Sequence, residues 1–298
     1  MNTCGRLLAA VSLCAAAVFP FDAISAQKKC ADVAGGGHVK SPYLGAIAVD
    51  ARDGRVLFED SSSVECFPAS CTKLMTARLL LKAISAGRLT LDDKIVQTQL
   101  SCREEPSKLD LAPGESVQAG DALAAIMVKS ANDIAVAIAE KLSGTVEDFV
   151  AEMNAEAVSL GMTNTCFVSP NGLPPATAKR GYDRSTPADL AKLAVAILRD
   201  QPEILEYTSK KSVRIPCRGG KIVEFRNHNN LVSKRNVMMK EADGLKTGYF
   251  RKAGFSIVAT GSRNGKRAVA VVVGSPSPSL RDSAAKKMLG DALDALDW

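Results

Sequence analysis

The sequence has only two histidines, His38 and His228, and it has no CxxC pair or Cys/His cluster. Structural zinc sites are built from such clusters, and a histidine-rich metal site needs more imidazoles than this chain has. A Ser-His-Asp triad also requires a histidine, so two histidines leave little room for that arrangement. We therefore expect a protein with no metal and no cofactor.

A large excess of charge of one sign is also missing. The chain has 38 Lys and Arg against 32 Asp and Glu, which gives a net charge of +6. This mild excess suits an anionic cell surface or an acidic polymer. No zinc-finger spacing, RNP motif or basic run is present, so we expect no nucleic-acid partner. Hydrophobic residues make up 46% and charged residues 23%, which excludes a disordered chain, a collagen and a multi-span membrane protein.

The N-terminal segment, residues 1–26, has the layout of a secretory signal peptide. One early cation, Arg6, precedes an apolar run over residues 7–19, and residues 23–26 (AISA) end the segment with small side chains. The run is shorter than the roughly 20 apolar residues of a membrane span, and an uncleaved N-terminal anchor is the alternative. Residues 27–43 contain an AGGG sequence and indicate a flexible leader. We therefore predict an exported protein with a single domain over residues 44–298.

Cysteine usage is consistent with export. Removal of residues 1–26 leaves an even number of cysteines, which permits disulfides in an oxidising compartment. The alternative is that several of them are small buried apolar side chains. The six are Cys30, Cys66, Cys71, Cys102, Cys166 and Cys217.

Strand patterns lie at both ends of the domain and helical patterns lie between them. Residues 45–50 and 55–59 surround an Asp-Gly turn, and residues 254–261 and 267–274 surround an Asn-Gly turn, so each pair predicts a β-hairpin. The tail predicts a helix whose polar face is acidic, which favours packing on a sheet over binding to a membrane surface. We therefore predict an α+β fold: an antiparallel sheet built from N- and C-terminal strands, flanked by helices, with an inserted helical region. The predicted helices cover residues 73–84, 119–129, 133–141, 146–160, 187–199 and 280–298.

The first candidate for chemistry is Ser70 with Lys73, in the sequence PASCTK. A spacing of three residues at the start of a helix puts both side chains on one face. A serine is a poor nucleophile until a base takes its proton, and a lysine does so when burial or a second cation lowers its pKa. The alternative is a helix-capping serine beside a surface lysine.

The second candidate, Ser130 with Asn132, lies between two predicted helices, where a turn presents side chains into a cleft. Ser130 is placed to pass a proton to a leaving amine. Asn132 is placed to hold a substrate amide or the Lys73 ammonium. Helix capping by either residue is the alternative.

The third candidate is the segment GLKTGY, residues 244–249, which has a strand pattern. Lys246 and Thr247 are suited to binding a carboxylate. We expect Gly248 to keep one face of the strand bare, so that a substrate approaches the backbone and adds as a strand. The alternative is an exposed strand with a turn glycine.

Together, in this order, the motifs Ser-x-x-Lys, Ser-x-Asn and Lys-Thr-Gly resemble the set found in penicillin-binding enzymes and serine β-lactamases. From about residue 41 to the C-terminus the chain is similar to low-molecular-mass penicillin-binding proteins, which are serine-type D-alanyl-D-alanine carboxypeptidases. The segments FPAS (67–70), NGLP (171–174) and NNL (229–231) add to the resemblance.

The resemblance implies a role for each of these residues. Ser70 attacks the carbonyl between two D-alanines and forms an acyl-enzyme, with Lys73 as its general base. Ser130 protonates the departing amine. The remaining roles are substrate binding: Asn132 orients the acyl amide, Lys246, Thr247 and Arg281 hold the terminal carboxylate, and the backbone N–H groups of Ser70 and Tyr249, which follows Gly248, form the oxyanion hole.

The same resemblance implies the partners and the location. The expected substrates are peptidoglycan pentapeptide stems that end in D-Ala-D-Ala, and the expected covalent inhibitors are β-lactams. The expected location is periplasmic or extracellular, at the cell wall. The C-terminal β-domain and amphipathic anchor of many relatives do not follow residue 298, so we expect no stable transmembrane anchor.

Three alternatives remain from the sequence. A class A β-lactamase uses a Glu between the second and third motifs, but residues 166–175 contain no Asp or Glu. A transpeptidase or endopeptidase differs in the shape of the cleft. A non-catalytic peptidoglycan-binding module is the third. Two departures from the family are Cys71, directly after the nucleophile, and residues 179–186, which lack a histidine that many relatives carry.

Overall fold

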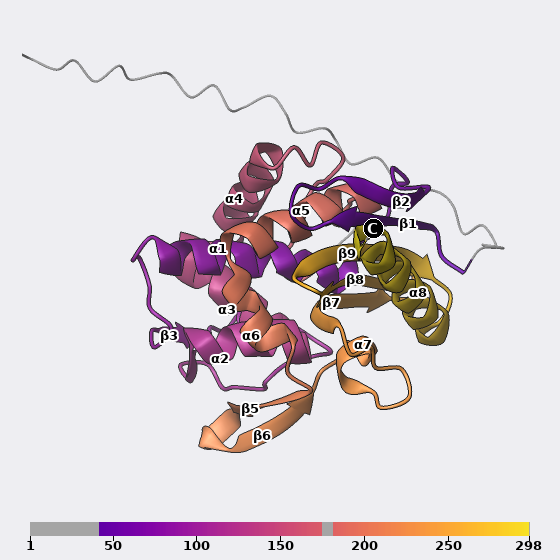
Figure 1. Ribbon diagram of the computed structural model, residues 1–298. Helices are drawn as coiled ribbons and strands as arrows, with labels where there is room; N and C mark the ends of the chain where they lie inside the picture. Colours follow the sequence, from indigo (N-terminus) through magenta and orange to yellow (C-terminus); the bar gives the residue numbers. More distant parts are fainter. Residues whose placement is uncertain (1–41, 175–180, 298) are drawn as a thin grey trace, which may run out of the picture. The chain divides into compact units, whose positions relative to one another are not determined.

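The computed structural model describes residues 42–174 and 181–297. The predicted signal peptide, residues 1–26, lies outside the described residues, as does nearly all of the predicted leader. The described residues form one unit (Figure 1).

A five-stranded antiparallel sheet forms the centre of this unit, in the order β2-β1-β9-β8-β7. Strands from the two ends of the chain meet where β1 pairs with β9, with Ile47 opposite Val271. The α+β fold predicted from the sequence is confirmed. The strands are β1 (Gly45–Asp50), β2 (Val56–Asp60), β7 (Ala242–Phe250), β8 (Gly254–Arg263) and β9 (Lys266–Ser275).

Both predicted hairpins form, because their turn residues accept the left-handed backbone that tight turns need. Asn264 and Gly265 have φ angles of 51° and 77° between β8 and β9, and Gly54 has a φ of 76° between β1 and β2. β9 is buried over six consecutive residues. This burial explains its unbroken run of Ala and Val, since a strand covered on both faces does not alternate.

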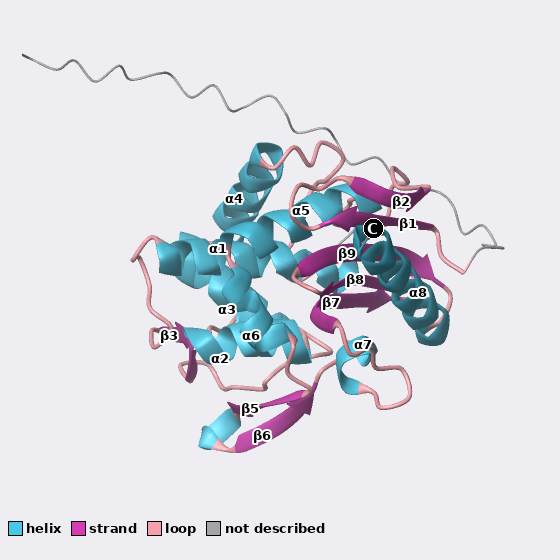
Figure 2. Ribbon diagram, in the orientation of Figure 1, coloured by secondary structure: helices cyan, strands magenta, loops and turns pink. Residues whose placement is uncertain are grey.

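The C-terminal helix α8 (Pro278–Asp297) covers one face of the sheet, over β8 and β9 (Figure 2). The sheet presents small side chains to it, including Ala46, Ala259 and Ala270, and α8 fills the space with Met288 and Leu289. Removing this apolar surface from water stabilises the contact by about 25 cal/mol per Å². The predicted packing of the tail on the sheet is confirmed.

The inserted helical region covers the other face, with α5 against β1 and β9. The predicted helix over 119–129 has two parts, an α-helix and a π-helical turn, η3 (Ala125–Lys129), that ends at Ser130. Two short antiparallel strand pairs were not predicted: β3 (Lys94–Val96) with β4 (Ser116–Gln118), and the hairpin of β5 (Ser212–Pro216) with β6 (Ile222–Arg226). The helices are α1 (Lys73–Ser85), α2 (Ala119–Ala124), α3 (Asn132–Ser143), α4 (Val146–Ser159), α5 (Pro187–Asp200), α6 (Leu205–Thr208) and α7 (Asn230–Ser233).

The thiols of Cys66, Cys71, Cys102 and Cys217 are free, so the possible disulfide is not formed by any of these four. Cys66 and Cys71 are buried in the main core as small apolar side chains, which is the alternative that the sequence left open. Burial raises the pKa of the Cys71 thiol to about 11, so this thiol stays protonated at neutral pH. Cys30 lies outside the described residues.

Candidate active site

Ser70 and Lys73 come together at the junction of a 3₁₀ turn, η1 (Ala69–Thr72), and helix α1. The Lys73 Nζ atom lies 3.1 Å from the Ser70 Oγ atom, as the spacing of three residues predicted. The sequence placed Ser70 in the first turn of the apolar helix, and the structure differs only in making that turn 3₁₀. Ala69, directly before Ser70, has a φ of 50°, a left-handed backbone that costs energy outside glycine and that is often found at functional sites.

Lys73 is completely buried and is surrounded by oxygen atoms. Its Nζ donates to Asn132 Oδ1 and to the carbonyl oxygen of Asn171, both at 2.7 Å. Burial, and then the nearby charge of Lys246, lower its pKa well below that of a free lysine. A neutral amine has two N–H groups and one lone pair. Since the two oxygens take the N–H groups, the lone pair is left for the Ser70 hydroxyl.

Ser130 ends η3 just before α3 and has a left-handed backbone, with a φ of 63°. Its Oγ is buried and has no hydrogen-bond partner among the described residues. An unpartnered buried hydroxyl is costly unless something else bonds to it. This hydroxyl is therefore available to a bound molecule or to a transferring proton.

Asn132 begins α3, and both atoms of its side-chain amide are already engaged. Its Oδ1 accepts from Lys73, and its Nδ2 donates to the carbonyl oxygen of Glu105 at 3.2 Å. Of the two tasks that the sequence suggested for Asn132, holding the lysine is the one present in this structure.

Strand β7 carries the third motif along the turn that holds Ser70. Lys246 is 1% exposed, and its Nζ donates to the Thr247 carbonyl oxygen at 2.9 Å. Burial lowers the pKa of Lys246 to about 8, which leaves it mostly protonated at neutral pH. Thr247 is also buried. A cation with few protein partners is the feature that an anionic ligand requires.

Gly248 has a packing role that the sequence did not predict. A side chain at this position would meet the carbonyl oxygen of Pro68 at 2.5 Å and the amide nitrogen of Cys71 at 3.2 Å. The face of β7 at Gly248 is therefore filled by η1, the turn that carries Ser70, and the approach of a substrate to the strand backbone stays a prediction. The glycine lets β7 approach Ser70 closely.

Tyr249 and Arg281 complete the predicted set. The Tyr249 side chain is 53% exposed and stacks on Phe255 of the neighbouring strand β8, with ring centroids 4.1 Å apart. Arg281 is buried at the start of α8, and its guanidinium donates to Asp282 Oδ1 at 2.6 Å. After burial, the charge of Arg281 contributes to lowering the pKa of Lys246, so the two cations share one region.

Asn171 was noted in the sequence only as part of NGLP, yet it binds Lys73 directly. The next residue, Gly172, has a φ of 80°, and a Cβ there would lie 1.9 Å from the Ala69 carbonyl oxygen. This loop is packed against η1, the turn that carries Ser70. Two acids near Lys73, Asp183 and Glu104, were missed because they come from distant segments. Asp183 accepts from Thr72 Oγ1 and Ser169 Oγ and anchors the loop.

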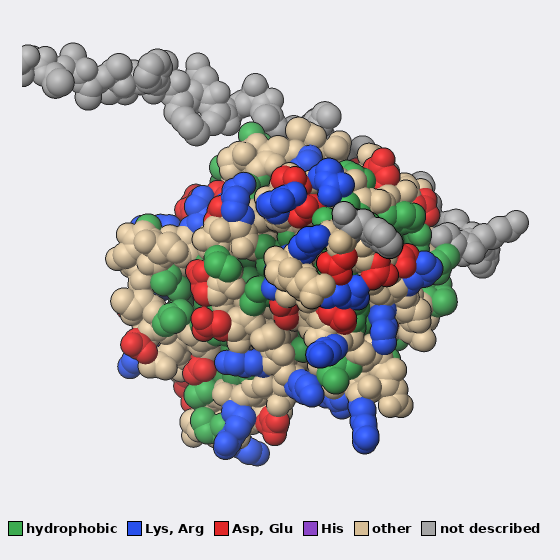
Figure 3. Space-filling view, viewed as in Figure 1, with side chains coloured by type: hydrophobic (Ala, Val, Ile, Leu, Met, Phe, Trp, Pro, Cys, Tyr) green, Lys and Arg blue, Asp and Glu red, His purple; other side chains and the backbone are tan. Residues whose placement is uncertain are grey.

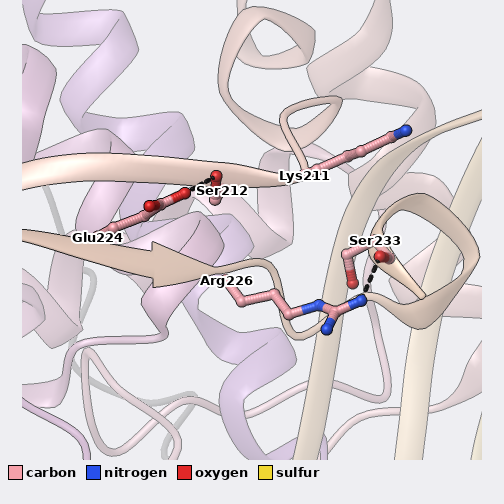
Figure 4. Close-up of a pocket in the computed structure, with 5 residues that line it drawn as sticks. All are labelled: Lys211, Ser212, Glu224, Arg226 and Ser233. Carbon is pink, nitrogen blue, oxygen red and sulfur yellow. Dashed lines mark hydrogen bonds between the residues drawn. The ribbon is translucent and has the colours of Figure 1, made fainter. Parts of the chain in front are cut away.

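A separate hollow of about 360 Å³ lies beside the β5–β6 hairpin (Figure 4). Ser212 donates to Glu224 Oε1 there at 2.5 Å, and Arg226 donates to the Ser233 carbonyl oxygen at 2.6 Å. The first contact joins β5 to β6, and the second ties the hairpin to α7. The face drawn in Figure 3 has basic and acidic side chains interspersed over its described residues. The described residues contain no group of three or more His, Cys, Asp and Glu side chains that could hold a metal.

Comparison with known proteins identifies the family. The family model described as D-alanyl-D-alanine carboxypeptidase matches residues 41–277. The chain belongs to this family. It is 32% identical over 244 residues to the D-alanyl-D-alanine carboxypeptidase DacF of Bacillus subtilis, and the match covers 82% of this chain and 60% of DacF. It is 30% identical over 260 residues to DacC of Escherichia coli, covering 84% of this chain and 62% of the relative. The chain thus spans about three fifths of the length of these relatives.

Solved structures of family members have the same fold. The D-alanyl-D-alanine carboxypeptidase DacD from Francisella tularensis superposes with a TM-score of 0.77 at 27% identity, covering 90% of this chain and 74% of that one. Penicillin-binding protein D2 from Listeria monocytogenes, in its ampicillin-bound form, gives a TM-score of 0.73 at 29% identity, covering 86% of this chain and 99% of that one.

Proposed function

We propose that this protein is a serine-type D-Ala-D-Ala carboxypeptidase that removes the terminal D-alanine from peptidoglycan stem peptides. The observation that carries the proposal is Lys73. It is buried, its pKa is held low, and its Nζ lies 3.1 Å from Ser70 Oγ while two carbonyl oxygens take its N–H groups. A base in this state activates a serine without a histidine.

In the first half of the reaction, Lys73 takes the proton of Ser70 as Ser70 Oγ attacks the carbonyl carbon between the two D-alanines. The backbone N–H groups of Ser70 and Tyr249 stabilise the developing oxyanion, and each such donor is typically worth about 3 kcal/mol. The proton passes through Ser130, whose hydroxyl is unpartnered within the described residues, to the departing amine. D-Alanine leaves, and the acyl group stays on Ser70.

The terminal carboxylate selects the substrate. Lys246 and Thr247 bind it, and Arg281 adds positive potential from the start of α8. The low exposure of Lys246 supports this role, because a charge-assisted hydrogen bond is stronger when water is excluded. Asn132, which holds Lys73 through its Oδ1 atom, also orients the acyl amide of the substrate.

β-Lactams are proposed as covalent inhibitors that acylate Ser70. The relative from Listeria monocytogenes is a penicillin-binding protein in an ampicillin-bound form, which supports the extension to this chain. We extend the proposal to export: residues 1–26 as a signal peptide, 27–43 as a leader and 44–298 as the catalytic domain, acting at the cell wall. Within residues 42–174 and 181–297, no helix has both the length and the apolar character of a membrane span.

The test is covalent labelling. Purified protein is incubated with benzylpenicillin, its intact mass is followed over time, and the labelled peptide is mapped. A long-lived adduct on Ser70, with release of D-alanine from a D-Ala-D-Ala peptide, is expected. Ser70→Ala should abolish both, while Ser63→Ala, at an exposed position seven residues earlier, should change neither.

Other outcomes select the alternatives. Rapid turnover of penicillin through a short-lived Ser70 adduct would identify a β-lactamase. A folded protein that forms no adduct with benzylpenicillin would indicate a non-catalytic binding module. A penicilloyl adduct that persists in Ser70→Ala would overturn the proposal.

A further inference from the structure

A carboxylate from an unexpected part of the chain lies beside the catalytic network. Glu104 follows the short 3₁₀ turn η2 (Ser101–Arg103), between the first and second motifs. Its loop is fastened to the second motif, because the amide nitrogen of Asn132 donates to the Ser107 carbonyl oxygen at 2.7 Å and Asn132 Nδ2 donates to that of Glu105. The position of Glu104 is therefore defined by the residue that holds Lys73.

Asn171 connects this carboxylate to the nucleophile. Asn171 Nδ2 donates to Glu104 Oε2 at 2.8 Å, while the Asn171 carbonyl oxygen accepts from Lys73. The next residue, Gly172, packs against the backbone of Ser70, with its Cβ position 3.1 Å from the Ser70 nitrogen. Glu104 is half-buried, and its charge reaches Lys73, where it opposes the lowering of the lysine pKa.

The other acid that acts on Lys73 has a structural task. Asp183 is buried and accepts hydrogen bonds from the backbone N–H groups of Val168 and Ser169 and from two side-chain hydroxyls. A carboxylate held by that many donors is poorly placed to take a proton from water. Glu104 is half-buried, so water reaches it, and a general base must lie within reach of the proton that it takes.

We propose that Glu104 is the general base for the water that hydrolyses the acyl-enzyme, with Asn171 holding its carboxylate in position. This inference rests on the proposed function. Water gives one proton to Glu104 as its oxygen bonds to the acyl carbon. The bond from that carbon to Ser70 Oγ then breaks, and the proton passes from Glu104 through Lys73 to Ser70 Oγ. The enzyme ends in its starting protonation state, and water is the only co-reactant.

The test separates the two halves of the reaction. The variant Glu104→Gln keeps an oxygen that can accept from Asn171 but cannot take a proton. We expect benzylpenicillin to acylate Glu104→Gln within about threefold of the wild-type rate. We expect the half-life of its Ser70 adduct to increase about a hundredfold, the lower end of what general-base catalysis contributes. The matched control is Glu105→Gln, because Glu105 is exposed and its carboxylate pairs with Lys108.

Hydroxylamine provides a second readout. As a strong nucleophile it needs little help from a base, so it should release the acyl group from Glu104→Gln and from the wild type at similar rates. A merely structural role for Glu104 would slow acylation, hydrolysis and hydroxylamine release together, and that result would overturn the proposal. An unchanged adduct half-life in Glu104→Gln would also overturn it while leaving the carboxypeptidase assignment intact. A wild-type protein that forms no adduct would overturn both.

Discussion

The helical side and the sheet side of the site each bury one lysine, and the two lysines are held in opposite ways. Lys73, on α1, lies within hydrogen-bond distance of three protein oxygens. The ammonium of Lys246, on β7, has one hydrogen-bond partner within the described part of the chain, the carbonyl oxygen of its own neighbour Thr247. Their exposed fractions are 0% and 1%, so burial alone does not distinguish them.

The difference lies in what each amine has left to give. Lys73 has its N–H groups occupied and its pKa lowered well below that of a free lysine, which suits the proposed role of a base. Lys246 keeps N–H groups that can donate to a ligand, and its pKa of about 8 leaves it mostly protonated at neutral pH. Both features suit the binding of an anion. The number of hydrogen-bond partners of each ammonium group, and not its burial, distinguishes the two lysines of this site.

The largest effect is expected at Lys73. We predict that Lys73→Met lowers the rate constant of acylation by benzylpenicillin about 10³- to 10⁴-fold, because Ser70 loses its base. The thermal unfolding temperature should change little, since methionine fills a similar volume. Stopped-flow acylation and thermal unfolding measure the two quantities. Lys141→Met, at an exposed position on α3, is the control.

If Lys73→Met acylated Ser70 at a rate near that of the wild type, the base would have to be another group. Lys73 and Lys246 would then not differ in the way that we propose.

A smaller effect of a different kind is expected at Lys246. We predict that Lys246→Met lowers kcat/KM for a D-Ala-D-Ala peptide about a hundredfold, since a hydrogen bond to a charged group is worth roughly 1.5–3 kcal/mol. Most of the loss should appear in KM, because this interaction is also made in the ground state. A loss confined to kcat would show that Lys246 shares the task of Lys73.

The close approach of the two sides provides the third prediction. Gly248→Ala places a Cβ 2.5 Å from the Pro68 carbonyl oxygen, so β7 must move away from the nucleophile turn. We expect acylation to slow about thirtyfold, because a displacement of about 1 Å costs up to a hundredfold in rate. We also expect a loss of about 1–3 kcal/mol in the free energy of unfolding.

The control for Gly248→Ala is Gly290→Ala on α8. A Cβ at Gly290 meets nothing within 4 Å. Since alanine is the better helix former by up to about 1 kcal/mol, this variant should be slightly stabilised and should acylate normally. Equal behaviour of the two variants in acylation would show that the contact between β7 and the nucleophile turn does not matter.

The sequence predicted the parts of this site that depend on local spacing. Ser70 and Lys73 are three residues apart on one turn, and the turn of each predicted hairpin contains residues that favour a left-handed backbone. Short-range geometry therefore determines both the Ser70–Lys73 pair and the hairpins. Contacts between distant segments were not predictable in this way. Glu104 reaches Asn171 across 67 positions, and no local pattern marks either residue as a partner of the other.

The packing role of Gly248 was missed for the same reason. Its sequence neighbours indicate a bare strand face, but what fills that face is a turn some 180 positions earlier in the chain. The sequence left open whether the cysteines form disulfides, because an even count does not say which thiols meet in the core, and four of the thiols are free. The three motifs could be ordered and assigned from sequence, whereas the packing between them could not.

The smallest predicted effect comes from pH, and it sharpens the comparison between the lysines. In the proposed mechanism Lys246 binds a carboxylate only while protonated, and its pKa is about 8. Above that pH its charge is lost, so kcat/KM should fall by about threefold between pH 7.5 and 8.5. In the proposed mechanism Lys73 acts in its neutral form. Its lowered pKa affects the acid side of the pH–rate profile, so Lys73 does not contribute to this alkaline decline. In Lys246→Arg the charge persists to much higher pH, and the decline between pH 7.5 and 8.5 should disappear even if the rate itself is reduced. A decline that stays at the same pH in Lys246→Arg would assign the alkaline limb to a different group and would remove the electrostatic distinction between the two sides of the site.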